Sequence, residues 1–366
     1  MENSGVTKSL IDWIDSLVGT IKGSIGAVTV LTTAFFGAIS GSNCSAVATI
    51  GTIMIPQLEK QGYPREYATA LVACAAPIAT LIPPSIAMIL FSVTGNLSVS
   101  ACFLATMVPG LLLTLGYIIY NYFIVRNNPN IIVHTKVTFK VRSNNIFRTS
   151  KKALPGIIMP SIVLGGIYSG LFSPTEAASV ALVYTVIIGL FIYKGLSFKT
   201  IYDSIANSAS VLGSIMVMLF FIFALGRELI LAGFPDSMAK FIIDMAGGNK
   251  YAILLFLNIT MLIIGMFMDD CSGSVLTAII LLPIATKVGI SPIHFAAIAG
   301  VNLGLGNITP PCAPLLLMAG SVGNIPLKEY VFHGIKMAMI VHLPLVFLTT
   351  YIPSLSLTLP NALGFN

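Results

Sequence analysis

Two adjacent carboxylates are the residues of this chain best suited to chemistry. Asp269 and Asp270 lie between two apolar runs, Tyr251–Met268 and Val275–Ala285. An acidic side chain within such a stretch is costly to bury, and it usually binds a cation, a proton or a substrate. One of the two could instead cap the helix expected to begin at Ser272. We expect at least one of them to bind a ligand.

A similar polar tip lies in the first half of the chain. Ser40-Gly41-Ser42-Asn43-Cys44-Ser45 separates the apolar runs Val28–Ile39 and Ala46–Ile55. Two short apolar arms joined by a polar tip predict a re-entrant helical hairpin, in which neither arm crosses a membrane alone. The tip Asp269–Ser274 predicts a second such hairpin.

Each hairpin precedes an apolar helix that a double proline interrupts. Ala68–Phe91 contains Pro83-Pro84, and Phe295–Met318 contains Pro310-Pro311. A proline removes a backbone donor and disrupts a helix. The freed carbonyls, with Ser, Thr and Asn oxygens, can replace water around Na⁺, and free N–H groups favour an anion. The pattern therefore predicts two cation sites with a substrate between them.

Each candidate cation site combines a tip with a break. The first comprises Ser40, Gly41, Ser42 and Asn43 with Pro83, Pro84 and Ser85. The second comprises Asp269, Asp270, Cys271 and Ser272 with Gly306, Asn307 and Thr309. The candidate substrate residues are Ser42, Ser45, Asp269, Ser272, Asn302 and Asn307. Small residues here could instead serve close helix packing, and the two Asn residues could tie the break together.

The two halves of the chain repeat each other. An offset of 227 residues carries Cys44 to Cys271 and Pro83-Pro84 to Pro310-Pro311. Five expected crossings separate the two hairpins, so the repeats should be inverted. The expected divisions are a first repeat (1–125), a basic cytoplasmic loop (126–152), a second repeat (153–352) and a tail (353–366).

The composition indicates an all-α polytopic membrane protein. Of the 366 residues, 56% are hydrophobic and 9% are charged, against about 25% charged in soluble domains. This excludes a soluble enzyme, a nucleic-acid-binding domain and a disordered chain. The five cysteines lie in apolar stretches and are expected to be buried packing residues. We expect no cofactor. The runs long enough to span a bilayer are Ala101–Val125, Ala153–Phe172, Glu176–Tyr193, Ala206–Leu231 and Val331–Ile352.

The net charge of +6 is concentrated in one segment. Basic residues in a loop between spans favour the cytoplasmic side of the membrane. Binding of anionic lipid or nucleic acid is the minor alternative. The segment holds seven basic residues and no acid: Arg126, Lys136, Lys140, Arg142, Arg148, Lys151 and Lys152.

The first repeat is incomplete relative to the second. Amphipathic segments near Val6–Val18 and Pro235–Met245 correspond at the same offset. Apolar helices between Ala153 and Leu231 precede only the second of these segments. The offset therefore predicts that the first repeat lacks an N-terminal piece of roughly 70 residues.

Several motifs together resemble a known family. They are Phe36-Gly37-Ala38-Ile39-Ser40-Gly41-Ser42, Gly51, Ile55-Pro56, Gly62-Tyr63-Pro64, Ile82-Pro83-Pro84-Ser85, Gly166–Ala177, Gly265-Met266-Phe267-Met268-Asp269, Val301-Asn302-Leu303-Gly304 and Thr309-Pro310-Pro311. This set is similar to the DctM-like large permease subunit of tripartite ATP-independent periplasmic (TRAP) transporters. Three positions depart from the family pattern: Ala46 replaces an acid, Asp270 a Thr, and Ala313 a Gly.

The resemblance implies an elevator-type importer of the ion-transporter superfamily, in the bacterial inner (cytoplasmic) membrane. Na⁺ would be the coupling ion, and the substrate would be a small organic anion such as a C4-dicarboxylate, keto acid or sugar acid. The implied partners are a small membrane subunit and a periplasmic substrate-binding protein, with no nucleic acid. On this interpretation, Ser42→Ala and Asp269→Ala should each weaken Na⁺ binding.

Three other interpretations fit parts of the sequence. The incomplete first repeat also fits a truncated, inactive transporter remnant. An ion channel fits the paired tips less well. An intramembrane aspartyl protease needs carboxylates from two facing helices, which the adjacent Asp269 and Asp270 do not supply.

Overall fold

The computed structural model describes residues 5–18, 22–131 and 139–365, and in these ranges the chain forms helices and turns with no strand. Among the described residues, six helices or continuous helix pairs are long and apolar enough to cross a membrane. The protein is therefore an all-α multi-pass membrane protein. The six are α7 (Val99–Val125), α9 with the π-helical turn η2 (Pro174–Ile192), α10 (Phe198–Leu231), α12 (Lys250–Phe267), α13 (Asp270–Lys287) and α16–α17 (Leu327–Tyr351).

The first half contains a hairpin, a broken helix and a long helix. An amphipathic helix, α1 (Val6–Val18), comes first. The hairpin is α2 (Ser24–Ser40) with α3 (Asn43–Lys60). The broken helix bends by 46° between its parts before and after the double proline. Its parts are α4 (Arg65–Ala75), α5 (Ile78–Leu81) and α6 (Ile86–Thr94).

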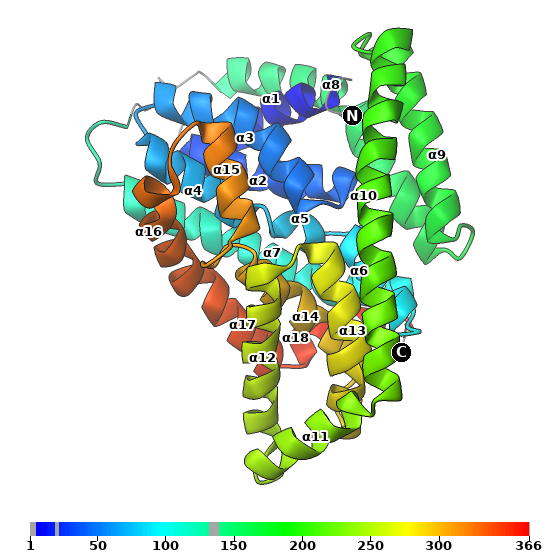
Figure 1. Cartoon of the computed structure of the whole chain (residues 1–366). Helices are drawn as coiled ribbons and strands as arrows, with labels where there is room; N and C mark the ends of the chain where they lie inside the picture. Colours follow the sequence, from blue (N-terminus) through cyan, green and yellow to red (C-terminus); the bar gives the residue numbers. More distant parts are fainter. Residues whose placement is uncertain (1–4, 19–21, 132–138, 366) are drawn as a thin grey trace.

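The second half has the same order of elements at the offset of 227. Its amphipathic helix is α11 (Phe234–Met245), and α12 with α13 form its hairpin. Adding 227 to the bounds of α3 gives those of α13. The second broken helix is α14 (Pro292–Gly306) with α15 (Pro314–Gly323). The amphipathic helices α1 and α11 lie at opposite ends of the molecule (Figure 1), as inverted repeats require.

The arms of both hairpins are longer than the apolar runs suggest. The four arms have 17 or 18 residues each, because each helix continues into its polar flank. By length and composition, α12 and α13 could each cross a bilayer. Length alone therefore does not distinguish the second hairpin from two spans.

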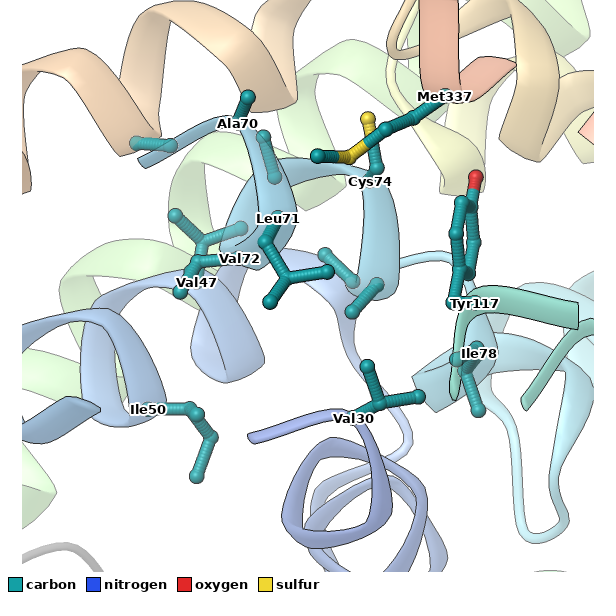
Figure 2. Packing of buried hydrophobic residues seen from close by; sticks show 14 of the residues in the cluster. Val30, Val47, Ile50, Ala70, Leu71, Val72, Cys74, Ile78, Tyr117 and Met337 are labelled. Carbon is teal, nitrogen blue, oxygen red and sulfur yellow. The ribbon is translucent and has the colours of Figure 1, made fainter. Parts of the chain in front are cut away.

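The first broken helix lies at the centre of the main apolar core. Every residue from Tyr67 to Leu81 is buried, as expected for a helix that is apolar on all sides. Leu71 and Ile78 pack with Val30 of α2, Tyr117 of α7 and Met337 of α16 (Figure 2). Both halves of the chain thus contribute to one core.

The two halves also exchange partners around the breaks. The second arm of the first hairpin, α3, packs on α15 of the other half. The second arm of the other hairpin, α13, packs on α6. Each hairpin thereby packs against a broken helix of the other half.

The helices that join the halves are the most exposed. α8 (Phe139–Tyr168) lies along α1, and the Trp13 indole donates to Ser150 over 2.9 Å. The 34-residue α10 runs along one side of the molecule (Figure 1) and packs on α13. In α10 only Leu219, Ile222 and Gly226 are buried.

The expected span Ala153–Phe172 and the expected burial of all five cysteines differ from the structure. Ala153–Phe172 was expected to span, but its helix, α8, also contains the basic Lys151 and Lys152 and is not among the six apolar candidates. The tail 353–366 is partly helical, since α18 (Ser354–Ala362) packs on α7. Cys44 and Cys312 are exposed because they lie at a tip and a break. In the basic loop, residues 132–138 with Lys136 lie outside the described residues.

Candidate functional site

The first tip is a two-residue turn between α2 and α3. Gly41 has a left-handed φ of 63°, and its N–H donates to the Gly37 carbonyl over 2.8 Å. A Cβ on Gly41 would lie 2.6 Å from the Pro84 carbonyl oxygen, so the position requires glycine. Ser42 caps α3 by accepting from the Ser45 N–H over 3.4 Å.

The first break is tied to this tip by the backbone. The Ile86 N–H donates to the Gly41 carbonyl over 3.2 Å. Pro83-Pro84 is a cis peptide between α5 and α6. Ser85 is fully buried and caps α6, since its hydroxyl accepts from the Met88 N–H. Ser40 to Asn43 and Pro83 to Ser85 are therefore brought together as expected.

The second tip is organised by a carboxylate. Asp269 caps α13, accepting from the Cys271 N–H over 3.0 Å and from the Ser272 hydroxyl. The helix begins at Asp270, two residues before the expected Ser272. The Ser272 hydroxyl also lies 2.9 Å from the Met218 sulfur of α10. One of the two carboxylates thus has a structural role.

The second break is tied to the second tip by side chains. The Asn307 amide, just after α14, donates to the Asp270 carboxylate. The Thr309 hydroxyl donates to the Leu305 carbonyl over 2.7 Å. The Leu315 N–H donates to the Asn307 carbonyl over 3.1 Å, across the cis bond Pro310-Pro311.

The two tips meet through residues that correspond in the repeat. Asn43, the first residue of α3, corresponds at the 227 offset to Asp270, the first residue of α13. The Asn43 amide lies close enough to the Asp270 carboxylate to interact with it, although its geometry is not that of a regular hydrogen bond. The structure therefore places a neutral amide opposite an acid.

Several side-chain oxygens of the first tip and the second break are buried without a hydrogen-bond partner. They are the Asn43 and Asn307 amide oxygens and the Ser40 hydroxyl. Asn43 is 0% exposed and Asn307 is 1% exposed. Unpaired buried polar atoms are unfavourable. A cation that prefers oxygen ligands would satisfy the Asn43 and Asn307 oxygens together with the Asp270 carboxylate.

Two predicted substrate residues take no side-chain part in the contact between the tips. Ser45 is exposed, and only its backbone N–H takes part in the first tip. The Asn302 amide donates instead to the Asn258 side chain over 2.8 Å. Asn258 in turn bonds Thr350 of α17 over 3.0 Å. Asn302 therefore ties the second broken helix to its neighbours.

Sequence reasoning did not identify this network or the buried His342. The His342 ring is 0% exposed and bonds the Val301 carbonyl over 2.9 Å and the Tyr117 hydroxyl over 3.4 Å. A single Asn or His inside an apolar run was the available signal, because such a side chain needs a buried partner.

Paired hairpins, broken helices and apolar spans define a membrane transporter subunit and not an enzyme. The chain belongs to the DctM family, since residues 1–355 match "Tripartite ATP-independent periplasmic transporter, DctM component". It is therefore a TRAP transporter large permease, a component of a tripartite secondary transporter.

Curated relatives are similar to this chain in sequence but have different cargo in their names. The C4-dicarboxylate TRAP large permease DctM of Pseudomonas aeruginosa is 35% identical, over 100% of this chain and 84% of the relative. The isethionate TRAP permease DctMQ of Oleidesulfovibrio alaskensis is 33% identical, over 97% and 55%. The sialic acid TRAP large permease SiaM of Vibrio cholerae is 28% identical, over 99% and 83%.

A solved structure shares the fold. The YdaH transporter of Alcanivorax borkumensis, described as having an unusual topology, superposes with a TM-score of 0.61. The match covers 96% of this chain and 83% of that chain, at 14% sequence identity. This likeness extends to the fold alone.

Proposed function

We propose that this permease imports a small organic anion together with Na⁺, by an elevator movement of its hairpins and broken helices. The relatives are named for C4-dicarboxylates, isethionate and sialic acid, all of which are organic anions. A C4-dicarboxylate, keto acid or sugar acid is the expected cargo here. A small membrane subunit and a periplasmic binding protein complete the system, in the bacterial inner membrane.

One observation carries this proposal: the buried, unpaired oxygens of Asn43 and Asn307 beside the Asp270 carboxylate. Oxygen donors of this kind suit a hard cation. In secondary transporters, the ends of interrupted helices supply the other ligands of such a cation.

The charges of the second tip suggest an order of binding. Asp269 and Asp270 face an incoming anion with like charge, and neither forms an ion pair within the described residues. Bound Na⁺ would offset these charges. The N-terminal ends of α3 and α13 would then favour the anion through their free N–H groups.

The test is Na⁺-specific stabilisation of the purified chain. We expect a higher melting temperature in NaCl than in KCl at equal ionic strength. A ligand at a hundredfold excess over its Kd stabilises the folded state by about 2.7 kcal/mol. Equal melting temperatures in the two salts would contradict the proposal and support an inactive remnant.

The choice of variants follows from the capping contacts. Ser42 and Asp269 each cap a helix, so their alanine variants would also lose about 1 kcal/mol of stability. Asp270→Asn and Ser40→Ala are better probes. Each should weaken the apparent Na⁺ affinity at least tenfold, measured from how the melting temperature depends on NaCl concentration. Asp244→Asn on α11 is the control and should leave the shift unchanged. Equal shifts in all three variants would rule out this site.

A further inference from the structure

A cluster of exposed basic side chains lies where α8 meets the end of η2. The α8 residues are Arg148, Lys151 and Lys152, and Lys194 and Lys199 follow η2. The Tyr193 hydroxyl donates to the Lys152 carbonyl over 2.7 Å, which joins the two segments. Residues 41 positions apart thus form one surface, called here the basic junction.

The basic junction keeps a net positive charge in the fold. Within the described part of the chain, the ion pairs are Arg65–Glu59 and Lys287–Asp236, so its five cations take part in neither. The packing of α1 on α8 brings Asp12 and Asp15 near, and α10 carries Asp203. Five basic residues still outnumber these three acids.

Exposed aromatic residues are close in sequence to the basic residues of the junction. Phe147 is 73% exposed, Phe198 is 86% exposed and Tyr202 is 73% exposed. Aromatic and basic side chains together are typical of the level at which lipid headgroups meet the hydrocarbon. The junction is thus suited to a membrane interface rather than to open water.

An apolar cavity lies further along the same two helices. Its volume is about 340 Å³, and its lining includes Met159 and Val163 of α8 and Ala181 and Leu182 of α9. Met159 is seven residues beyond Lys152, or about 10 Å along a helix. The cavity therefore lies within the reach of an acyl chain from the basic junction.

We propose that the basic junction and this cavity together bind one anionic phospholipid. The phosphate would lie between Lys152 and Lys194, and one acyl chain would occupy the cavity. A nucleic acid would use the charges but not an apolar cavity. Because Ser40, Gly41 and Pro84 also border the cavity, the bound chain would touch the first tip and its break.

The headgroup half of the proposal is tested by charge removal. Purified protein is titrated with dioleoylphosphatidylglycerol or dioleoylphosphatidylcholine, and binding is followed by native mass spectrometry and melting temperature. Lys152→Gln with Lys194→Gln should weaken phosphatidylglycerol binding on the order of 30-fold, from about 1 kcal/mol per charge. The Tyr193 bond is kept, since it uses the Lys152 backbone. Lys328→Gln with Lys336→Gln on α16 is the matched control.

The acyl half is tested without changing any charge. Ala181→Phe should fill the cavity and weaken phosphatidylglycerol binding at least fivefold, and Leu182→Trp is a second way to fill it. Val183→Phe, at a 60% exposed neighbour, is the control and should bind as the natural protein does.

Several outcomes would overturn the proposal. Equal binding of the two lipids, or equal losses in the α16 control, would remove the headgroup site. Unchanged lipid binding in both cavity variants would remove the acyl site. Displacement of the lipid by a single-stranded oligonucleotide at low micromolar concentration would assign the basic junction to nucleic acid instead.

Discussion

Ala313 holds a backbone conformation that its side chain disfavours. It is fully buried, precedes α15 and has a left-handed φ of 43°. A non-glycine residue in this region costs roughly 1–2 kcal/mol.

Ala313→Gly should therefore stabilise the protein by about 1 kcal/mol, because it relieves this strain. Thermal unfolding in detergent measures the change. Asn324→Gly is the control, since Asn324 also has a positive φ of 49° but asparagine tolerates it better. A lower melting temperature for Ala313→Gly would show that the lost methyl packing outweighs the strain.

Asn43 and Asp270 occupy equivalent backbone positions in the two repeats but differ in charge. Both begin the second arm of a hairpin, and they face each other at the tips. The backbone arrangement is common to both halves, whereas the charge is not. The two tips can therefore differ in ligand affinity although their helices correspond.

At the scale of helices, close backbone contact fixes the second hairpin against its broken helix. A Cβ on Gly265 of α12 would lie 2.8 Å from the Leu303 carbonyl oxygen and 3.0 Å from the Gly306 Cα. Neither of these backbone atoms can move without moving α14. The contact places Asp270 within reach of Asn307.

Gly265→Ala should destabilise the protein by about 1–3 kcal/mol through overpacking. It should also weaken Na⁺ binding, because the tip would separate from the break. Gly213→Ala on α10 is the matched control, with no atom within 4 Å of its added Cβ, and should be neutral or up to about 1 kcal/mol stabilising. Equal melting temperatures for both variants would show that the α12–α14 contact yields easily.

The amphipathic helix α11 is held to α13 by an ion pair. Lys287 donates to the Asp236 carboxylate, and this bond lowers the pKa of Asp236 below its usual value of 3.8. A lowered folded-state pKa stabilises the protein above the unfolded pKa, and the effect is lost as pH falls through the folded value.

Asp236→Asn should therefore lower the melting temperature at pH 6, and the difference should begin to shrink at about pH 4 and vanish only below the lowered folded-state pKa of Asp236. Salt at about 1 M should also reduce it, because both side chains are exposed. Asp244→Asn on the same helix is the control. A difference that persists in acid would attribute the effect to packing instead of charge.

For the whole molecule, local signals predicted the elements around the site. Double prolines and polar tips fix helix ends through backbone chemistry, so the tips, the breaks and the offset of 227 were readable from sequence. The capping contact of Asp269 was one of two stated alternatives. The contact between Asp270 and Asn307 follows from the pairing of each tip with its own break.

Long-range packing was not readable in the same way. Nothing local indicates that α3 packs on α15 and α13 on α6, since any apolar face can pack on any other. The sequence does not indicate Asn258, and it leaves Asn302 open between binding a ligand and tying the break together, because their hydrogen bond joins positions 44 residues apart. The sequence pattern did not indicate that α8 is one continuous helix. Charged residues give way abruptly to apolar residues along it, whereas helix propensity stays similar.

The length of α10 has a consequence for the membrane that holds the protein. Its 34 residues extend about 50 Å, whereas a hydrocarbon core is about 30 Å thick. Such a helix must tilt or emerge from the bilayer, at a cost that depends on local thickness. Hydrophobic mismatch thus makes acyl-chain length a variable that should influence this permease independently of headgroup charge.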